Sequence, residues 1–222
     1  MNSAPFPIIG IGASAGGIDA FHAFFDHMPA DCGMAFVMIL HLPADRKSLL
    51  SSILSHWTRM PVIEAVDGTK IEPNHVYVPP PHAIVSLVDG FLGIEMPPEK
   101  SDRVFRPIDG FFDSLAATMR EQAVGIILSG TGSDGVLGLK VIKECGGLTI
   151  AQGSDGTAPQ YGEMPAGAIA TGAVDLISPV EKIPGHLLRL KNVHIEVPQA
   201  ADAASAIDTA RLTICTLELV DG

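Results

Sequence analysis

Apolar residues in the first quarter of the chain alternate between unbroken runs and a helical repeat. Residues 7–13 and 34–40 are continuous apolar runs, which are typical of strands that are buried on both faces of a sheet. Each run is followed by a segment, 18–25 and then 45–57, in which apolar residues recur at helical spacing. The pattern predicts two successive strand–helix units.

The same alternation returns in the second half of the chain. The expected helices are 107–119, 136–145 and 180–190, and the expected strands are 124–128 and 148–151. A proline opens the first of these helices, where its fixed φ angle suits a helix start, and a glycine pair closes the second.

The middle of the chain, residues 61–98, has a different character. It contains short apolar segments at 62–66, 75–78, 84–88 and 91–94. Asp89-Gly90 between the last two is a strong signal for a two-residue hairpin turn. Because strands alternate with helices elsewhere, we expect an α/β fold. It should be a doubly wound, mostly parallel, Rossmann-like three-layer sheet with a β-hairpin insertion.

The end of the chain departs from this alternation. After residue 190 comes a stretch rich in alanine and aspartate, and residues 212–219 then alternate like a strand. With 222 residues the chain suits one ordinary α/β domain. We therefore expect the domain at 1–190 and a linker or tail of uncertain structure at 191–222.

Composition excludes several classes of function. A formal net charge of -11, without a cluster of Lys and Arg, argues against nucleic acid as a partner. The apolar runs are too short to cross a membrane and no secretory signal is evident, so we expect a cytoplasmic protein without membrane insertion. Three cysteines without a C-x-x-C pair, and histidines without metal-ligand spacing, suggest neither a disulfide framework nor a metal site. No cofactor is expected.

Reactive side chains follow three of the predicted strands. Ser14 lies in the glycine-rich turn after the first strand, His41 follows the second, and Asp134 lies in a glycine-rich loop after residues 124–128. Ligands of parallel sheets bind at the carboxyl ends of strands, so we expect these side chains to share one edge. A serine, an imidazole and a carboxylate suffice for acyl transfer, because the imidazole removes the hydroxyl proton and the carboxylate orients the imidazole.

Each of these residues also has a more ordinary interpretation. Gly10-x-Gly12-x-x-x-Gly16 is a loose variant of the dinucleotide-binding fingerprint, which leaves a nucleotide-binding oxidoreductase as an alternative. Against it, the second strand ends in His41 rather than in a ribose-binding acid. Asp134 could cap the helix that begins near residue 136, and His41 taken alone could be a surface histidine.

Two further residues are candidates near such a site. His82, after a run of three prolines, is a possible cleft residue. Arg106 could contact a carboxylate of a ligand, although a salt bridge at a helix start is the more ordinary role. The chain order Ser, His, Asp also differs from that of the usual α/β-hydrolases, in which the acid precedes the histidine.

Motifs along most of the chain resemble one known family, the catalytic domain of the chemotaxis protein-glutamate methylesterases (CheB). The matching segments are Ile11-Gly12-Ala13-Ser14-Ala15-Gly16-Gly17, His41-Leu42-Pro43, Pro73-x-His75-Val76-Tyr77-x-Pro79-Pro80, Arg106-Pro107-Ile108-Asp109, Gly130-Thr131-Gly132-Ser133-Asp134-Gly135 and Gly162-Glu163-Met164-Pro165. They occur in family order between about residues 8 and 190, so the resemblance is specific.

The resemblance implies an activity and a substrate. It implies that Ser14, His41 and Asp134 form a catalytic triad, with the backbone N–H groups of Ala15 and Thr131 as oxyanion donors. The family hydrolyses glutamate methyl esters on the cytoplasmic helices of methyl-accepting chemoreceptors, releases methanol, and deamidates certain receptor glutamines. Many members carry threonine at the position of Ala15 and methionine at that of Thr131. A backbone donor should tolerate the second change.

The resemblance is incomplete at the front of the chain. Family proteins usually begin with a phosphorylatable receiver domain, and Ser14 is too near the start for one, so we expect no control by phosphorylation in cis. The motif details are more similar to the versions fused to methyltransferase and sensor domains, which would be fused or separate partners. A nonenzymatic regulatory or docking domain with the same fold is the alternative function.

Overall fold

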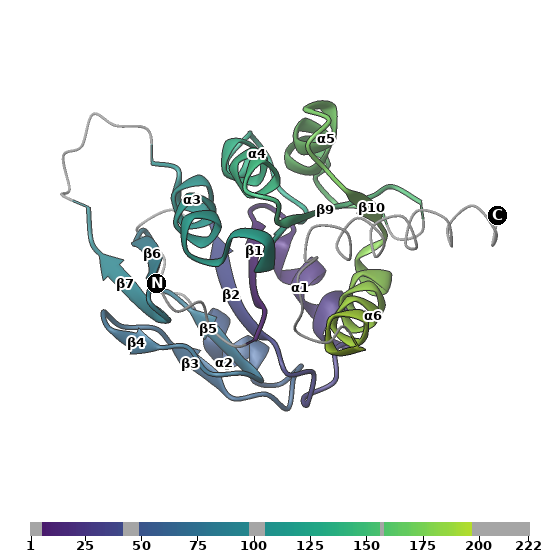
Figure 1. The fold of residues 1–222 in the computed structure, drawn as a ribbon. Coiled ribbons are helices and arrows are strands. Elements are labelled where there is room, and N and C mark those ends of the chain that lie inside the picture. Colours follow the sequence, from purple (N-terminus) through teal and green to yellow (C-terminus); the bar gives the residue numbers. More distant parts are fainter. Residues whose placement is uncertain (1–5, 42–48, 98–104, 156–157, 197–222) are drawn as a thin grey trace.

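The computed structural model describes residues 6–41, 49–97, 105–155 and 158–196. Its main sheet has seven strands in the order β10-β9-β8-β1-β2-β5-β3, and every pairing in it is parallel (Figure 1). The strands are β1 (Ile8–Ala13), β2 (Ala35–Leu40), β3 (Val62–Glu64), β5 (His75–Val78), β8 (Ala123–Ile127), β9 (Leu148–Gln152) and β10 (Leu176–Ser178). The predicted doubly wound, mostly parallel sheet is confirmed.

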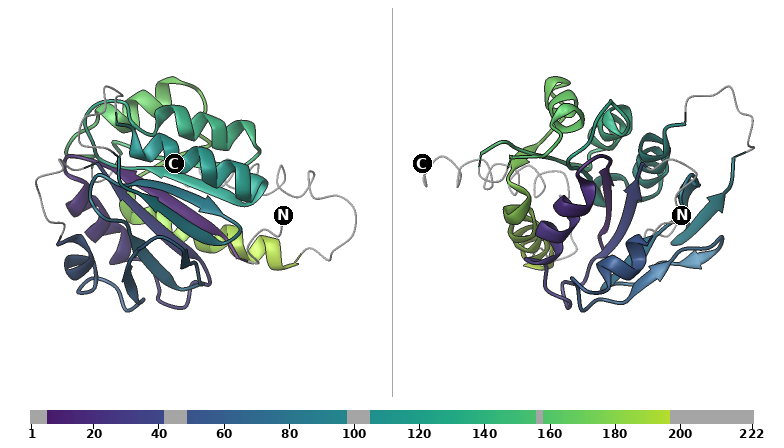
Figure 2. Two further views of the ribbon diagram at one scale, coloured as in Figure 1. Left: turned by 90° about the vertical axis from the view of Figure 1, so that its left-hand side faces the viewer. Right: turned by 180° about the vertical axis from the view of Figure 1, so that it is seen from behind.

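Helices cover both faces of this sheet (Figure 2). One face packs against α1 (Gly17–Phe25), α2 (Leu50–Leu54) and α6 (Ile183–Glu196), the last preceded by the 3-10 turn η2 (Val180–Lys182). The other packs against α3 (Pro107–Met119), α4 (Val136–Glu144) and α5 (Glu163–Ala170), and η1 (Arg120–Gln122) follows α3. Two separate apolar cores result, one on each face.

The predicted hairpin forms, but the region around it is organised differently from the expectation. Strands β6 (Ile84–Val88) and β7 (Phe91–Glu95) pair antiparallel, and Asp89 and Gly90 both have positive φ between them. A two-residue strand, β4 (Thr69–Lys70), joins them in a separate three-stranded sheet that packs on α3. The other middle strands, β3 and β5, instead extend the main sheet, because β5 pairs with β2.

Several element boundaries also differ from the predictions. Helix α2 ends at Leu54, and residues 55–57 form a turn rather than the end of a helix. Strand β10 and helix α5 are not predicted by the apolar pattern. Residues 45–48, part of the predicted 45–57 helix, and the predicted strand 212–219 lie outside the described residues, and the division at residue 190 stays a prediction.

Close packing of α3 against β1 explains two of the glycines in the nucleotide-like motif. A Cβ atom on Gly12 would lie 2.4 Å from Cγ2 of Ile108, and one on Gly10 would lie 2.9 Å from the rings of Phe111 and Phe112. Glycine is therefore needed at both positions for helix packing. These glycines do not require a bound phosphate to explain them.

Candidate active site

The three predicted site residues follow adjacent strands. Because β2, β1 and β8 are neighbours and parallel, their carboxyl ends meet at one edge. The His41 N–H donates to the Ala13 carbonyl (3.0 Å), and the Ser14 N–H donates to the Ser129 carbonyl (3.0 Å). These bonds continue the ladder past the strand ends, and Asp134 lies in the loop after β8. The predicted shared edge is confirmed.

Ser14 lies in a tight turn between β1 and α1. The Gly17 N–H donates to the Ser14 carbonyl (2.9 Å), so the helix begins within three residues of the serine. Gly16 adopts the left-handed conformation with φ 71°, and a Cβ atom there would lie 2.7 Å from Oγ of Ser129. Both the backbone angle and the lack of space require glycine at this position.

His41 and Asp134 contact each other. Nδ1 of His41 lies 3.4 Å from Oδ2 of Asp134, and the side chains are 38% and 6% exposed. The carboxylate is thus buried behind an accessible imidazole, as in a hydrolase in which the acid orients the base. Among the described residues, the Ser14 hydroxyl donates no hydrogen bond to His41. Catalytic hydrogen bonds are often long without substrate and tighten when it binds.

Asp134 also caps a helix, but not the helix that the sequence suggests. Its two carboxylate oxygens accept the N–H groups of Ile108 and Asp109, both at 3.1 Å, in the first turn of α3. Helix α4 is capped instead by Asp109, whose carboxylate accepts the Gly138 N–H (2.8 Å). The prediction that Asp134 could cap α4 is therefore wrong. Packing of α3 against α4 places Asp134, in the loop before α4, at the start of α3, and it places Asp109 of α3 at the start of α4.

Arg106 also links α3 to the loop that carries Asp134. Its Nε lies 2.6 Å from Oδ2 of Asp109, and its Nη2 donates to the Ser133 carbonyl (2.8 Å) in the loop that carries Asp134. The salt-bridge interpretation of Arg106 is confirmed. Asp109 is the residue of this cluster that the reasoning from the chain did not single out, although it stands in the Arg106-Pro107-Ile108-Asp109 motif.

The N–H groups of Ala15 and Thr131 are oriented by hydrogen bonds that the carbonyls of the same peptide units accept. The carbonyl of Ser14 is held by the first turn of α1, and the carbonyl of Gly130 accepts the Met164 N–H (3.0 Å) at the start of α5. In a trans peptide the N–H points opposite to the carbonyl, so the N–H groups of Ala15 and Thr131 point away from those helices. Neither has an acceptor among the described residues. A Cβ on Gly130 would lie 3.0 Å from that of Ser14, so the loop backbone packs against the serine.

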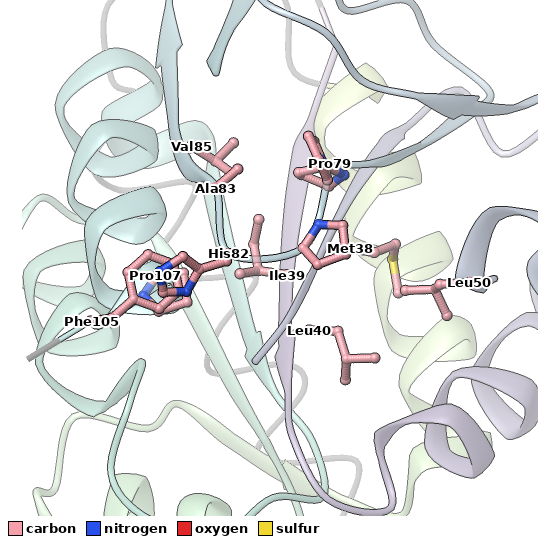
Figure 3. Close-up of a pocket in the computed structure, with 12 residues that line it drawn as sticks. Met38, Ile39, Leu40, Leu50, Pro79, His82, Ala83, Val85, Phe105 and Pro107 are labelled. Atoms are coloured by element: carbon pink, nitrogen blue, oxygen red, sulfur yellow. The ribbon is translucent and has the colours of Figure 1, made fainter. Parts of the chain in front are cut away.

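A pocket lined mostly by apolar residues lies where β2 and β5 end (Figure 3). Its lining consists of Met38, Ile39, Leu40, Leu50, Pro79, Pro80, Pro81, His82, Ala83, Val85, Phe105 and Pro107. The ring of Phe105 stands 4.2 Å from that of His82 and 6.0 Å, edge-on, from that of His41, measured between centroids. The prediction of His82 as a cleft residue is confirmed, and its φ of 60° marks a strained backbone.

Within the described ranges, no three His, Cys, Asp or Glu side chains gather as a metal site would require. None of the helices that the structure describes is long and apolar enough to cross a membrane.

The fold and this edge define a doubly wound α/β protein with a serine, a histidine and an aspartate after three neighbouring strands. The model of the CheB methylesterase family matches residues 9–187. The chain therefore belongs to the CheB methylesterase family, and the resemblance seen in the motifs is confirmed.

Individual relatives agree with this assignment. A protein-glutamate methylesterase/protein-glutamine glutaminase of Xanthomonas oryzae pv. oryzae is 34% identical over 206 residues, covering 86% of this chain and 56% of the relative. One from Burkholderia lata is 37% identical over 183 residues, covering 82% and 53%. The chain thus spans about half the length of these relatives. The crystal structure of the Thermotoga maritima CheB methylesterase catalytic domain matches with a TM-score of 0.75 and 27% identity, covering 84% of this chain and 100% of that domain.

Proposed function

We propose that this chain is a protein-glutamate methylesterase that hydrolyses glutamate methyl esters through an acyl-enzyme on Ser14. One observation carries the proposal: the buried Asp134 carboxylate contacts the accessible His41 ring, 3.4 Å away, on the sheet edge that also holds Ser14. Acyl transfer requires a serine, a base and an acid, and all three lie on this edge.

The proposed reaction has two steps. His41 removes the proton of the Ser14 hydroxyl while Oγ attacks the ester carbonyl, and Asp134 stabilises the imidazolium that forms. The oxyanion accepts hydrogen bonds from the N–H groups of Ala15 and Thr131, each worth about 2.7–4 kcal/mol in measured cases. The imidazolium then protonates the leaving methoxide, and methanol departs. Water, deprotonated by His41, attacks the acyl-enzyme and releases the glutamate.

The substrate part of the proposal rests on the relatives. They are named protein-glutamate methylesterase/protein-glutamine glutaminase, so the same chemistry on a glutamine side chain, with ammonia as the leaving group, is included here. The natural substrates would be methylated helices in the cytoplasmic part of chemoreceptors. A methyltransferase or sensor module, fused or separate, would be a partner, and the reaction needs no cofactor.

The test is methanol release from methylated chemoreceptors. We expect Ser14→Ala to lower the rate at least about 10⁴-fold, because the nucleophile is lost. Ser55→Ala, which changes an exposed serine in the turn after α2, serves as the control and should keep the wild-type rate. Unchanged methanol release in Ser14→Ala would refute the mechanism.

A fluorophosphonate probe distinguishes the alternative function. This reagent reacts covalently with activated serines. Labelling at Ser14 without receptor demethylation would therefore support a serine hydrolase and refute only the proposed receptor substrate. Absence of labelling together with absence of demethylation would favour a nonenzymatic docking domain with the same fold.

A further inference from the structure

A second serine, Ser129, lies directly behind Ser14. It follows β8, its side chain is buried, and only 1% of the residue is exposed. The Ser129 carbonyl accepts the Ser14 N–H (3.0 Å), and its own N–H donates to Oε1 of the buried Gln152 at the end of β9 (2.9 Å). Its backbone therefore links the turn of Ser14 to the ends of β8 and β9.

The Ser129 hydroxyl makes further connections at the same edge. It donates to the Ala15 carbonyl (2.9 Å), one residue after Ser14, and it accepts the Tyr161 N–H (3.0 Å) from the segment before α5. A hydroxyl has one proton to donate, and of the two carbonyls within reach that of Ala15, in the Ser14 turn, is nearer (2.9 Å) than that of Tyr161 (3.4 Å). Three segments that are distant in sequence are thus held by one buried oxygen.

We propose that Ser129 is a positioning residue that fixes the turn of Ser14 through its hydroxyl. This inference rests on the proposed function, in which Ser14 is the nucleophile. The Ala15 carbonyl is held by Ser129 and the Ser14 carbonyl by Gly17, so both peptide units after the nucleophile are fixed. The first of these units carries the Ala15 N–H, the proposed oxyanion donor.

Loss of the Ser129 hydroxyl would remove the hydrogen bonds that fix the turn of Ser14. Without Oγ, the Ala15 carbonyl and the Tyr161 N–H lose their partner in a part-buried site, and the turn can move to find others. A displacement of a catalytic group by about 1 Å can cost about 100-fold in rate. The effect should therefore fall on the chemical step.

Ser129 is not an alternative nucleophile. Its burial keeps substrate away, and its proton is donated to a carbonyl rather than to a base. Ser14 is partly exposed and lies on the edge with His41. The structure assigns orientation to Ser129 and attack to Ser14.

The experiment compares Ser129→Ala with Ser178→Ala. Ser178, at the end of β10, is also 1% exposed and donates its hydroxyl to a backbone carbonyl, that of Pro179 (3.3 Å), two strands away from β8. It matches the loss of a buried hydroxyl without touching the turn of Ser14. Both are assayed by fluorophosphonate labelling of Ser14 and by hydrolysis of p-nitrophenyl acetate, with melting temperatures measured in parallel.

We expect Ser129→Ala to slow labelling and kcat by about 10- to 100-fold with KM unchanged, while Ser178→Ala stays within about twofold of wild type. Ser129→Thr, which keeps the hydroxyl, should recover most of the lost rate. Wild-type labelling in Ser129→Ala, or an equal loss in Ser178→Ala, would overturn the proposal. Neither reagent contains a glutamate ester. The comparison of Ser129→Ala with Ser178→Ala is therefore valid even if the proposed receptor substrate is wrong. If Ser14 reacts with neither reagent in the wild-type protein, the proposed function itself is refuted.

Discussion

At the scale of single residues, Asp134 combines two roles that are usually separate. Its oxygens accept two N–H groups of α3, and one of them also contacts His41. The helix bonds fix the carboxylate so that it meets the imidazole from one direction. A substitution at this position therefore affects helix stability and the base together, and the two effects can be separated by the choice of side chain.

Asp134→Asn and Asp134→Ala should differ in stability but not in activity. Asparagine keeps one acceptor oxygen for α3, but its NH2 group cannot accept the second N–H and it offers no carboxylate to His41, so we expect kcat to fall by about 10⁴-fold while only part of the helix cap is lost. Alanine removes the rest of the cap as well, which should lower the free energy of unfolding by a further 1–2 kcal/mol or so. Ester hydrolysis and urea unfolding measure the two quantities. Asparagine with near wild-type kcat would remove Asp134 from the mechanism.

At the scale of elements, the end of α3 is strained. Arg120 terminates the helix with φ 48° and ψ -120°, a conformation that favours glycine, and its side chain is exposed. We expect Arg120→Gly to raise the free energy of unfolding by about 1 kcal/mol, because the strain is relieved and little packing is lost. Urea unfolding measures the change.

Glu121→Gly is the matched control for this prediction. Glu121 is the next residue, is also exposed, and is outside the residues with positive φ. Glycine there should destabilise, because it only adds conformational freedom to the unfolded chain. If both variants lost stability equally, strain at Arg120 would not be the cause.

The apolar pattern predicts the strands and helices that are long and buried, and it fails where structure depends on distant partners. Strands β1, β2 and β8 are continuous apolar runs, so their position and the shared edge of Ser14 and His41 follow from the chain alone. Strand β4 has two residues and β5 joins the sheet through β2, which no local pattern specifies.

In the candidate site, too, some features follow from the local sequence and others depend on distant partners. That a serine, a histidine and an aspartate share an edge follows from parallel strands, because their carboxyl ends meet. That Asp134 caps α3 instead of α4 depends on the close approach of two helices at Gly138, where a Cβ would lie 2.8 Å from the Asp109 carbonyl oxygen. Likewise, the role of Ser129 depends on Tyr161, 32 residues further along the chain.

At the scale of the whole molecule, a buried histidine makes stability depend on pH. Burial, together with the positive charges of Arg189 and Lys182, lowers the pKa of His186 in α6 below its ordinary value of 6.5. The Arg189 guanidinium also lies 3.1 Å from Nδ1 of His186, which suits a neutral ring. Below pH 6.5 the unfolded chain takes up a proton that the folded chain resists.

The free energy of unfolding should therefore fall as the pH drops below 6.5, and less so in His186→Gln. Glutamine keeps a polar side chain that can accept from Arg189 but does not titrate. Urea unfolding at a series of pH values, from about 8 to about 5, gives the two curves. Curves that stay parallel over the whole range would exclude His186 as the source.

The crossed contacts between α3 and α4 mean that Asp134 is an oriented group only while these two helices are packed. A local opening that separates them would release Asp134 from its donors, and Asp109 from the Gly138 N–H, in the same event, while the rest of the sheet stays folded. The rate of hydrolysis would then depend on the fraction of time for which α3 and α4 are packed together. A fluctuation too small to appear in a melting curve would still leave the molecule, for its duration, without a working base.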